Sequence, residues 1–147
     1  MKLLLAAALA LLASAPGWAA ESPEAVLKRI YAEEGAVVAP ARLPDYYSRD
    51  LAAALRKDQD SDEVGAVGFD WLYDAQDAEI TDLTFEAIAD GPDGSLIEAR
   101  FRNFDEPKAV RWTLCRRPNG DWRVSDVATD AWSLRQLLSL PPEPATC

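Results

Sequence analysis

The sequence contains no histidine, only two cysteines and only seven glycines among its 147 residues. Histidine is the commonest general base near neutral pH, so its absence excludes a Ser-His-Asp arrangement and a zinc ion held by histidine. Two cysteines do not form a structural zinc site, and the chain has no glycine-rich phosphate-binding loop. We therefore expect neither a cofactor nor a metal ion, and we expect binding rather than catalysis.

The chain also lacks an apolar run long enough to anchor it in a membrane. Its longest apolar run, residues 3–13, follows Lys2 and ends at a Ser-Ala-Pro-Gly segment. This pattern is typical of a cleaved signal peptide, with Gly17 and Ala19 as the small residues before the cut. We predict a signal peptide over residues 1–19, and a mature chain that is periplasmic or secreted and is not inserted in a membrane.

Basic residues are in the minority: 15 Lys and Arg stand against 25 Asp and Glu, for a net charge of −10. This balance argues against nucleic acid or an anionic membrane as a partner. The remaining length predicts a single domain over residues 20–140, followed by a proline-rich tail at 141–147. A disulfide between Cys115 and Cys147 would fasten this tail in an oxidising compartment; the alternative is that one or both thiols stay free.

The apolar residues repeat first with a helical period and then with a period of two. Ser22, Pro23 and Glu24 predict the start of a helix that stops at Gly35. Residues 36–44 predict a linker, and Ser48 the cap of a second helix. Strands are predicted over residues 83–89 and 97–101, and a final helix over roughly 131–140.

The segment "RPNGD", residues 117–121, sets the register of the last two strands. It predicts a three-residue hairpin loop with Gly120 at the left-handed position, which pairs Leu114 with Val124. Trp112 and Trp122 then share the apolar face with that pair, whereas a two-residue turn would mix the faces. The predicted fold class is α+β, with N-terminal helices packed on a curved four-stranded antiparallel sheet and a short C-terminal helix.

Three segments in this order, "FDWLYDAQD", "GDWRVSDV" and "WSLRQLL", resemble the exported bacterial family of domain of unknown function 3828. The similarity covers about residues 24–140. It implies a cystatin-like or nuclear-transport-factor-2-like cone, in which a curved sheet wraps helices. The resemblance implies no activity, cofactor or catalytic residue.

The stretch "GFDWLYDAQD", residues 68–77, places three aspartates among aromatic residues. We interpret it as two tight turns, with Asp70 capping the first and Asp74 or Asp77 accepting backbone N–H groups in the second. Trp71, Leu72 and Tyr73 would then close the open end of the cone.

A second interpretation places a ligand between the sheet and the helices. An aspartate desolvated among aromatic rings acquires a raised pKa and can transfer protons. Asp126, on the Trp122 face by parity, is the leading catalytic candidate, followed by Asp70 with Tyr73; the alternatives for Asp126 are a buried partner for an arginine or a cap of the final helix. The residues that would line this pocket are Trp71, Tyr73, Trp112, Trp122, Asp126, Arg102 and Arg135.

Two further motifs have simpler interpretations. The acidic segment from Asp58 begins like a calcium loop, but Glu63 replaces the turn glycine and Phe69 the closing glutamate, which favours a solvated loop. Ser133 has no base to activate it as a nucleophile, and we expect it to cap the final helix or to pack against its neighbours. The strand arginines are expected to pair with the protein's own carboxylates, with an acidic partner as the alternative; they are Arg100, Arg102, Arg111, Arg116, Arg117 and Arg123.

These observations favour a non-enzymatic exported binding domain whose partner is a small molecule, a peptide or an envelope protein. The alternative is an enzyme of the isomerase or dehydratase type that uses a pocket aspartate and a tyrosine.

Overall fold

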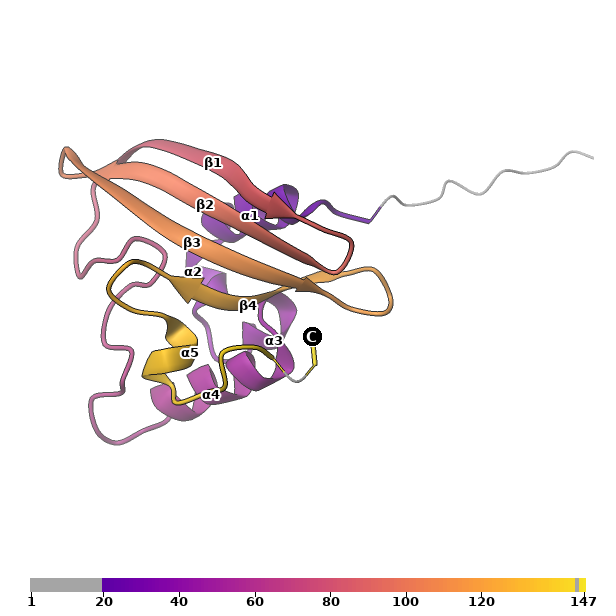
Figure 1. Cartoon of the computed structure of the whole chain (residues 1–147). Coiled ribbons are helices and arrows are strands. Elements are labelled where there is room, and N and C mark those ends of the chain that lie inside the picture. The colour runs from indigo at the N-terminus through magenta and orange to yellow at the C-terminus, as the bar shows by residue number, and fades with distance from the viewer. Residues whose placement is uncertain (1–19, 145) are drawn as a thin grey trace, which may run out of the picture.

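The computed structural model describes residues 20–144 and 146–147, so the predicted signal peptide lies outside the described residues. Four helices precede the sheet: α1 (Pro23–Ala32), α2 (Glu34–Val37), α3 (Leu43–Tyr46) and α4 (Arg49–Gln59). The sheet consists of β1 (Ile80–Asp90), β2 (Gly94–Asn103), β3 (Glu106–Arg116) and β4 (Trp122–Ala128), and α5 (Leu134–Leu137) follows it (Figure 1). The strands are antiparallel neighbours in the order β1-β2-β3-β4. The predicted fold class is confirmed.

The turn between β3 and β4 sets the predicted register. The Arg117 amide donates to the Asp121 carbonyl at 2.8 Å, and Gly120 has φ +94°. Leu114 therefore pairs with Val124, and both side chains are buried on the core face. The predicted pairing of Leu114 with Val124 is therefore confirmed.

Substituting Gly120 by alanine is expected to lower the free energy of unfolding by about 1 kcal/mol, because an L side chain is strained at this positive φ. A Cβ there would meet no atom closer than 3.7 Å, so the cost is one of backbone conformation and not of collision. Gly35→Ala is the matched control: Gly35 lies in α2 with open space around it, so alanine should stabilise slightly. Urea denaturation of both variants checks this, and an equal effect in both would contradict it.

The helices cover one side of the sheet, and the core lies between the two layers. Leu27 and Ile30 of α1 are fully buried, as are Leu51 and Leu55 of α4. In Figure 1, α4 and α5 lie beside β4, and α1 lies behind the strands. The chain between α3 and α4 covers the free edge of β4, because the Ser48 amide donates to the Val124 carbonyl at 2.8 Å. This contact fixes the start of α4 against the sheet.

Three helix boundaries differ from the prediction. The first helix ends at Ala32, and Gly35 lies inside α2 instead of stopping a helix. The predicted linker contains the start of α3, which has Pro44 in its first turn. The final helix has four residues and begins at Leu134, because Ser133 caps its N-terminus by accepting from the Gln136 amide at 3.1 Å. Ser133 therefore has the capping role expected of it.

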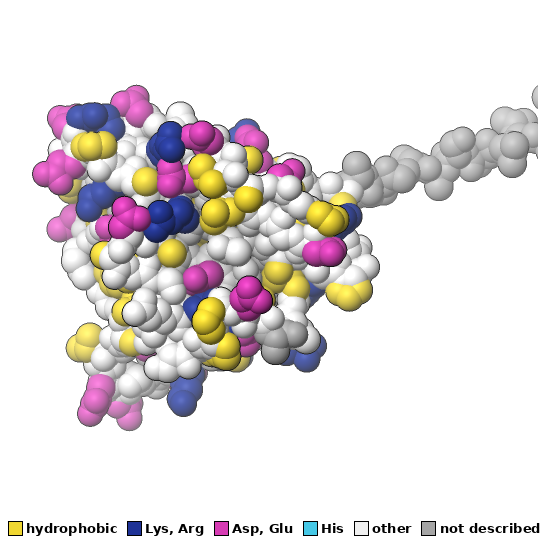
Figure 2. All heavy atoms as spheres, in the orientation of Figure 1, with side chains coloured by type: hydrophobic (Ala, Val, Ile, Leu, Met, Phe, Trp, Pro, Cys, Tyr) yellow, Lys and Arg dark blue, Asp and Glu magenta, His cyan; other side chains and the backbone are white. Residues whose placement is uncertain are grey.

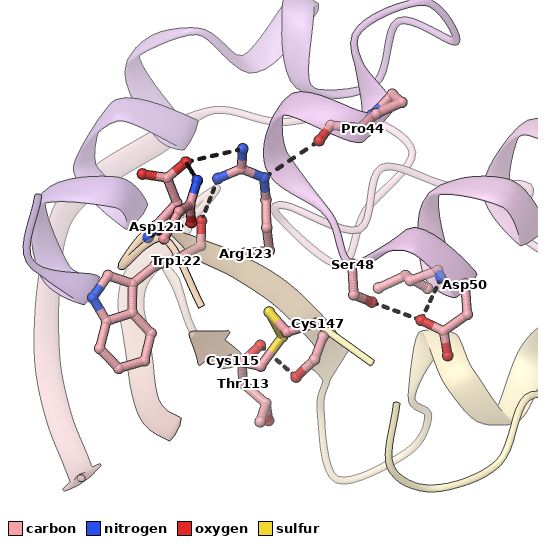
Figure 3. Close-up of a disulfide and its surroundings, with 12 residues drawn as sticks. Pro44, Ser48, Asp50, Thr113, Cys115, Asp121, Trp122, Arg123 and Cys147 are labelled. Carbon is pink, nitrogen blue, oxygen red and sulfur yellow. Dashed lines mark hydrogen bonds and ion pairs between the residues drawn. A yellow bond between two sulfur atoms is a disulfide. The ribbon is translucent and has the colours of Figure 1, made fainter. Parts of the chain in front are cut away.

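Ser48 precedes α4 as predicted, but its hydroxyl does not cap the helix. It donates to Asp50 Oδ1 at 2.8 Å, and the same oxygen accepts from the Leu51 amide at 2.9 Å (Figure 3). The first turn of α4 thus holds a buried serine and a half-buried carboxylate that takes part in a wider network.

On the outer face of the sheet, acidic and basic side chains are interspersed (Figure 2). Arg100 forms ion pairs with Glu86 and Glu98, and Arg111 with Asp130. The expectation that strand arginines pair with the protein's own carboxylates holds for these residues and for Arg123, which lies 3.8 Å from Asp121. No helix of the described residues is long and apolar enough to cross a membrane.

Candidate functional site

The space between sheet and helices is filled by aromatic side chains. Trp112 is fully buried, and its indole donates to the Tyr31 hydroxyl at 3.2 Å. That hydroxyl donates in turn to the Leu72 carbonyl at 2.8 Å. The Tyr31 ring lies 5.6 Å from both the Trp112 and the Tyr73 rings, in edge-on contacts. Trp112 and Tyr73, expected to line a ligand pocket, therefore form part of the core.

The remaining aromatic candidates lie at the margins of this core. Trp71 is buried, its indole donates to the Tyr47 hydroxyl at 2.9 Å, and it borders a small cleft of about 320 Å³. Trp122 is also buried, lies under the Arg116 guanidinium and borders a polar cleft of about 220 Å³. The four aromatic candidates do not meet in one cavity in the described part of the chain.

Asp126 does not lie on the Trp122 face, so the parity argument for it is wrong. A β-bulge shifts the register after Leu114: Thr113 pairs with Asp126, and Trp112 with Val127. Ser125 is the extra residue, and Val127 takes the core position that parity assigned to Asp126. Bulges add one residue to one strand and exchange the two faces beyond it.

The Asp126 carboxylate caps the final helix. Its Oδ1 accepts from the Val127 amide at 2.9 Å and from the Arg135 amide at 3.1 Å. Burial raises the pKa of this carboxyl above its usual range, although these hydrogen bonds oppose the shift. The capping role was one of the alternatives, and both of these backbone hydrogen bonds go to the same carboxylate oxygen.

Arg135 is buried, and its guanidinium bonds to the C-terminal tail and to α4 instead of to the Asp126 carboxylate. Its guanidinium donates to Asp50 Oδ2 at 2.6 Å and to the carbonyls of Ser125, Pro141 and Glu143. Burial acts to raise the pKa of Asp50, but the hydrogen bonds from Arg135 and Ser48 outweigh it and hold that pKa below its usual range. Arg102, the other proposed pocket arginine, donates to the Asp105 carbonyl on the surface.

In the stretch of residues 68–77, Asp70 behaves as predicted and Asp74 does not. Asp70 Oδ1 accepts from the Leu72 amide at 2.9 Å, and burial raises its pKa. Asp74 accepts from the Trp132 indole at 2.7 Å, and lies 3.5 Å from Lys108 Nζ, so it bonds no backbone amide in the second turn. The Asp77 carbonyl accepts from Asn103 Nδ2 at 3.2 Å.

The Tyr73 hydroxyl donates to Glu34 at 2.7 Å, and the burial of Tyr73 raises its pKa. It is not among the residues that line the small cleft beside Asp70. Within the described residues, the proposed aspartate and tyrosine therefore do not converge on one open space.

The acidic loop after α4 is held by hydrogen bonds to backbone amides. The Asp58 carboxylate accepts from the amides of Ala66 and Val67, at 2.7 Å and 3.1 Å. No group of three or more potential metal ligands occurs in the residues that the structure describes.

The Cys115–Cys147 disulfide is formed, with the two Cα atoms 5.7 Å apart. It fastens the C-terminus to β3 (Figure 3). A structural disulfide of this kind indicates an oxidising compartment.

A surface cleft lies on α4 and not within the cone. It has a volume of about 650 Å³, within the range of small-molecule sites. Its apolar part consists of Pro44, Tyr47, Ala52 and Ala53. Its polar part has four cations and one acid: Arg49, Arg56, Lys57, Arg117 and Asp60. In a chain of net charge −10, this cleft is locally positive.

Three of these cations have no partner among the described residues. Arg49, Lys57 and Arg117 make neither an ion pair nor a side-chain hydrogen bond there, whereas every other described Lys or Arg makes at least one. Arg56 donates to the Pro40 carbonyl at 2.8 Å, which orders that side of the cleft. The three basic groups without a partner in the described part of the chain therefore lie together beside an apolar surface.

None of these cleft residues was a predicted pocket residue. The spacing of Arg49, Ala53 and Arg56 places them on one face of α4, since positions four and seven residues apart share a face. That spacing was the available signal. Arg117 carries no such signal, because only the tertiary structure brings the β3–β4 turn to α4.

The chain is thus a small α+β domain with a cation-lined surface cleft. No protein-family model and no curated protein matches it. A solved structure of a phospholipid-binding protein from Ralstonia solanacearum, in complex with a phospholipid, aligns over 80% of this chain and 69% of its own length, with 14% identity and a TM-score of 0.35. A similarity of this extent assigns neither a family nor a ligand to this chain.

Proposed function

We propose that this chain is an exported, non-enzymatic binding domain that takes an anionic ligand in the cleft on α4. The observation that carries the proposal is the position of Arg49, Lys57 and Arg117, three cations beside an apolar surface that have no partner among residues 20–144 and 146–147. A ligand anion would supply the charge-assisted hydrogen bonds that these side chains do not make within the protein. The apolar part of the cleft would bury the remainder of the ligand.

Export and the absence of catalysis belong to the same proposal. The predicted signal peptide and the Cys115–Cys147 disulfide agree in pointing to an oxidising compartment outside the cytoplasm. Asp126 serves as a helix cap and Asp70 as a turn cap, which leaves the isomerase or dehydratase alternative without a converging acid and hydroxyl. Membership in the family of domain of unknown function 3828 is likewise proposed, on the three sequence segments alone.

The anionic dye 8-anilinonaphthalene-1-sulfonate tests the proposal, because its sulfonate and its rings match the two parts of the cleft. We expect the folded protein to enhance its fluorescence, and Arg117→Gln to weaken binding about tenfold through loss of a charge-assisted contact. Binding should also weaken with added salt. Arg111→Gln is the matched control, because this strand arginine makes an exposed ion pair with Asp130 away from the cleft.

Near-ultraviolet circular dichroism checks that each variant is folded, so that a change in dye binding is not caused by unfolding. Equal dye affinity in the Arg117→Gln variant and the wild type would contradict the assignment of the site to this cleft.

A further inference from the structure

We infer that the ligand of the α4 cleft is an amphiphilic anion: a small molecule with a carboxylate, sulfate or phosphate head and an aliphatic chain. The inference rests on the proposed function, because it assumes that this cleft is the binding site. It adds the chemical class of the ligand, which follows from how charge and apolar surface are arranged.

The cations border the cleft, and small apolar side chains lie between them. Arg49 and Arg56 are seven residues apart on α4, which separates them by about 10 Å along the helix axis. Ala53 lies between them on the same face and is exposed, and Ala52 lies beside it. Ala53 and Pro44 give the cleft an exposed apolar strip without hydrogen-bonding side chains, to which Ala52, 5% exposed, adds little. A purely ionic ligand would gain nothing from this strip, whereas an aliphatic chain would bury it.

Arg117 approaches from the β3–β4 turn and is half-buried, while Arg49, Arg56 and Lys57 on α4 are exposed. A head group at this border would meet cations from two elements of the fold. Asp60 is the single acid of the cleft and disfavours a second negative charge at its end of the strip. An amphiphile with one charged end fits this distribution better than a chain of several acids.

The size of the cleft also favours a small molecule over a protein segment. A volume of about 650 Å³ holds a ligand of drug-like size. A stable protein partner would need roughly 800 Å² of contact surface on this chain, which this single cleft does not supply. The alternative ligand is a short acidic peptide, and the experiment includes a peptide probe to detect it.

The test uses NMR of the purified, disulfide-bonded protein and follows the methyl signals of Ala52 and Ala53, with the buried Ala99 as reference. Four probes are titrated: decanoate, butyrate, decyltrimethylammonium and hexaglutamate. The two ten-carbon amphiphiles are kept below their critical micelle concentrations. We expect decanoate to shift the two cleft methyl signals at concentrations at least tenfold lower than butyrate requires, because each buried methylene adds to affinity. The cationic amphiphile should leave them unchanged.

Two variants at Ala53 distinguish the effect of an added negative charge on ligand binding from the effect of an added side chain of the same size. Ala53→Glu places a carboxylate in the strip and should weaken decanoate binding about tenfold more than Ala53→Gln, which has nearly the same size without the charge. Both residues are good helix formers, so α4 is retained.

Each other outcome overturns a defined part of the proposal. If hexaglutamate shifts the cleft signals at lower concentration than decanoate does, the ligand class is wrong and an acidic peptide replaces it, while the anion-binding cleft stands. If the cationic amphiphile binds as well as decanoate, or if no anion shifts these signals, the proposed function itself is wrong.

Discussion

Replacing Arg135 by methionine is expected to lower the free energy of unfolding by about 3–5 kcal/mol. The Arg135 side chain is 2% exposed and donates to the Asp50 carboxylate and to three carbonyl groups. Methionine fills similar space but donates nothing, so it leaves a half-buried charge and carbonyls without partners. Urea denaturation followed by tryptophan fluorescence measures the loss.

Two matched variants show whether the hydrogen-bond network is the cause. Arg135→Lys keeps the charge but has no planar fork to reach several acceptors, so an intermediate loss is expected. Arg111→Met removes an exposed arginine whose partner Asp130 is 96% exposed, and should cost less than about 1 kcal/mol. If Arg135→Met costs no more than Arg111→Met, the network does not stabilise the fold as proposed.

Removing the disulfide through the double substitution Cys115→Ser and Cys147→Ser should cost about 3–4 kcal/mol. The bridge closes a loop across a sequence separation of 32, which restricts the unfolded chain. That loop contains β4, α5 and the tail, so its closure holds together one edge of the sheet. The thermal unfolding midpoint, measured with and without a reducing agent, checks this prediction.

The reducing agent should lower the midpoint of the wild type and leave that of the double variant unchanged. Arg135 also holds the tail, through the carbonyls of Pro141 and Glu143. The losses from the disulfide and from Arg135→Met should therefore not add, because both act on the same segment. Unchanged wild-type stability after reduction would show that Arg135 alone fastens the tail.

The elements that sequence predicted well depend on local chemistry. Alternation with a period of two identifies strands wherever one face is buried; β2 and β3 follow it, and β4 follows it up to the bulge at Ser125. Gly120 set the register because its positive φ is needed by the turn itself, whatever surrounds it. Ser22 starts α1 as predicted, since its hydroxyl accepts from the Ala25 amide only three residues away.

The errors in the prediction arose where distant contacts override local preference. Gly35 has no positive φ and sits within a helical turn, so its identity alone did not end the helix. No residue pattern in the sequence indicates the bulge at Ser125, yet this bulge places Asp126 on the other face of β4. Asp74 or Asp77 was expected to accept backbone N–H groups, but the Asp74 carboxylate accepts from the Trp132 indole, 58 positions further along the chain.

The sequence by itself determined the α+β class and the pairing of Leu114 with Val124 beside the β3–β4 turn, because these follow from periodicity and turn chemistry along neighbouring residues. Only the tertiary structure decided which cations remain without partners and where they meet. The net charge argued against nucleic acid or an anionic membrane as a partner, but charge is a sum over the chain, whereas a ligand responds to the groups within a Debye length of it. Arg117 reaches the cleft on α4 only after the sheet has folded, and no spacing in the sequence encodes that approach.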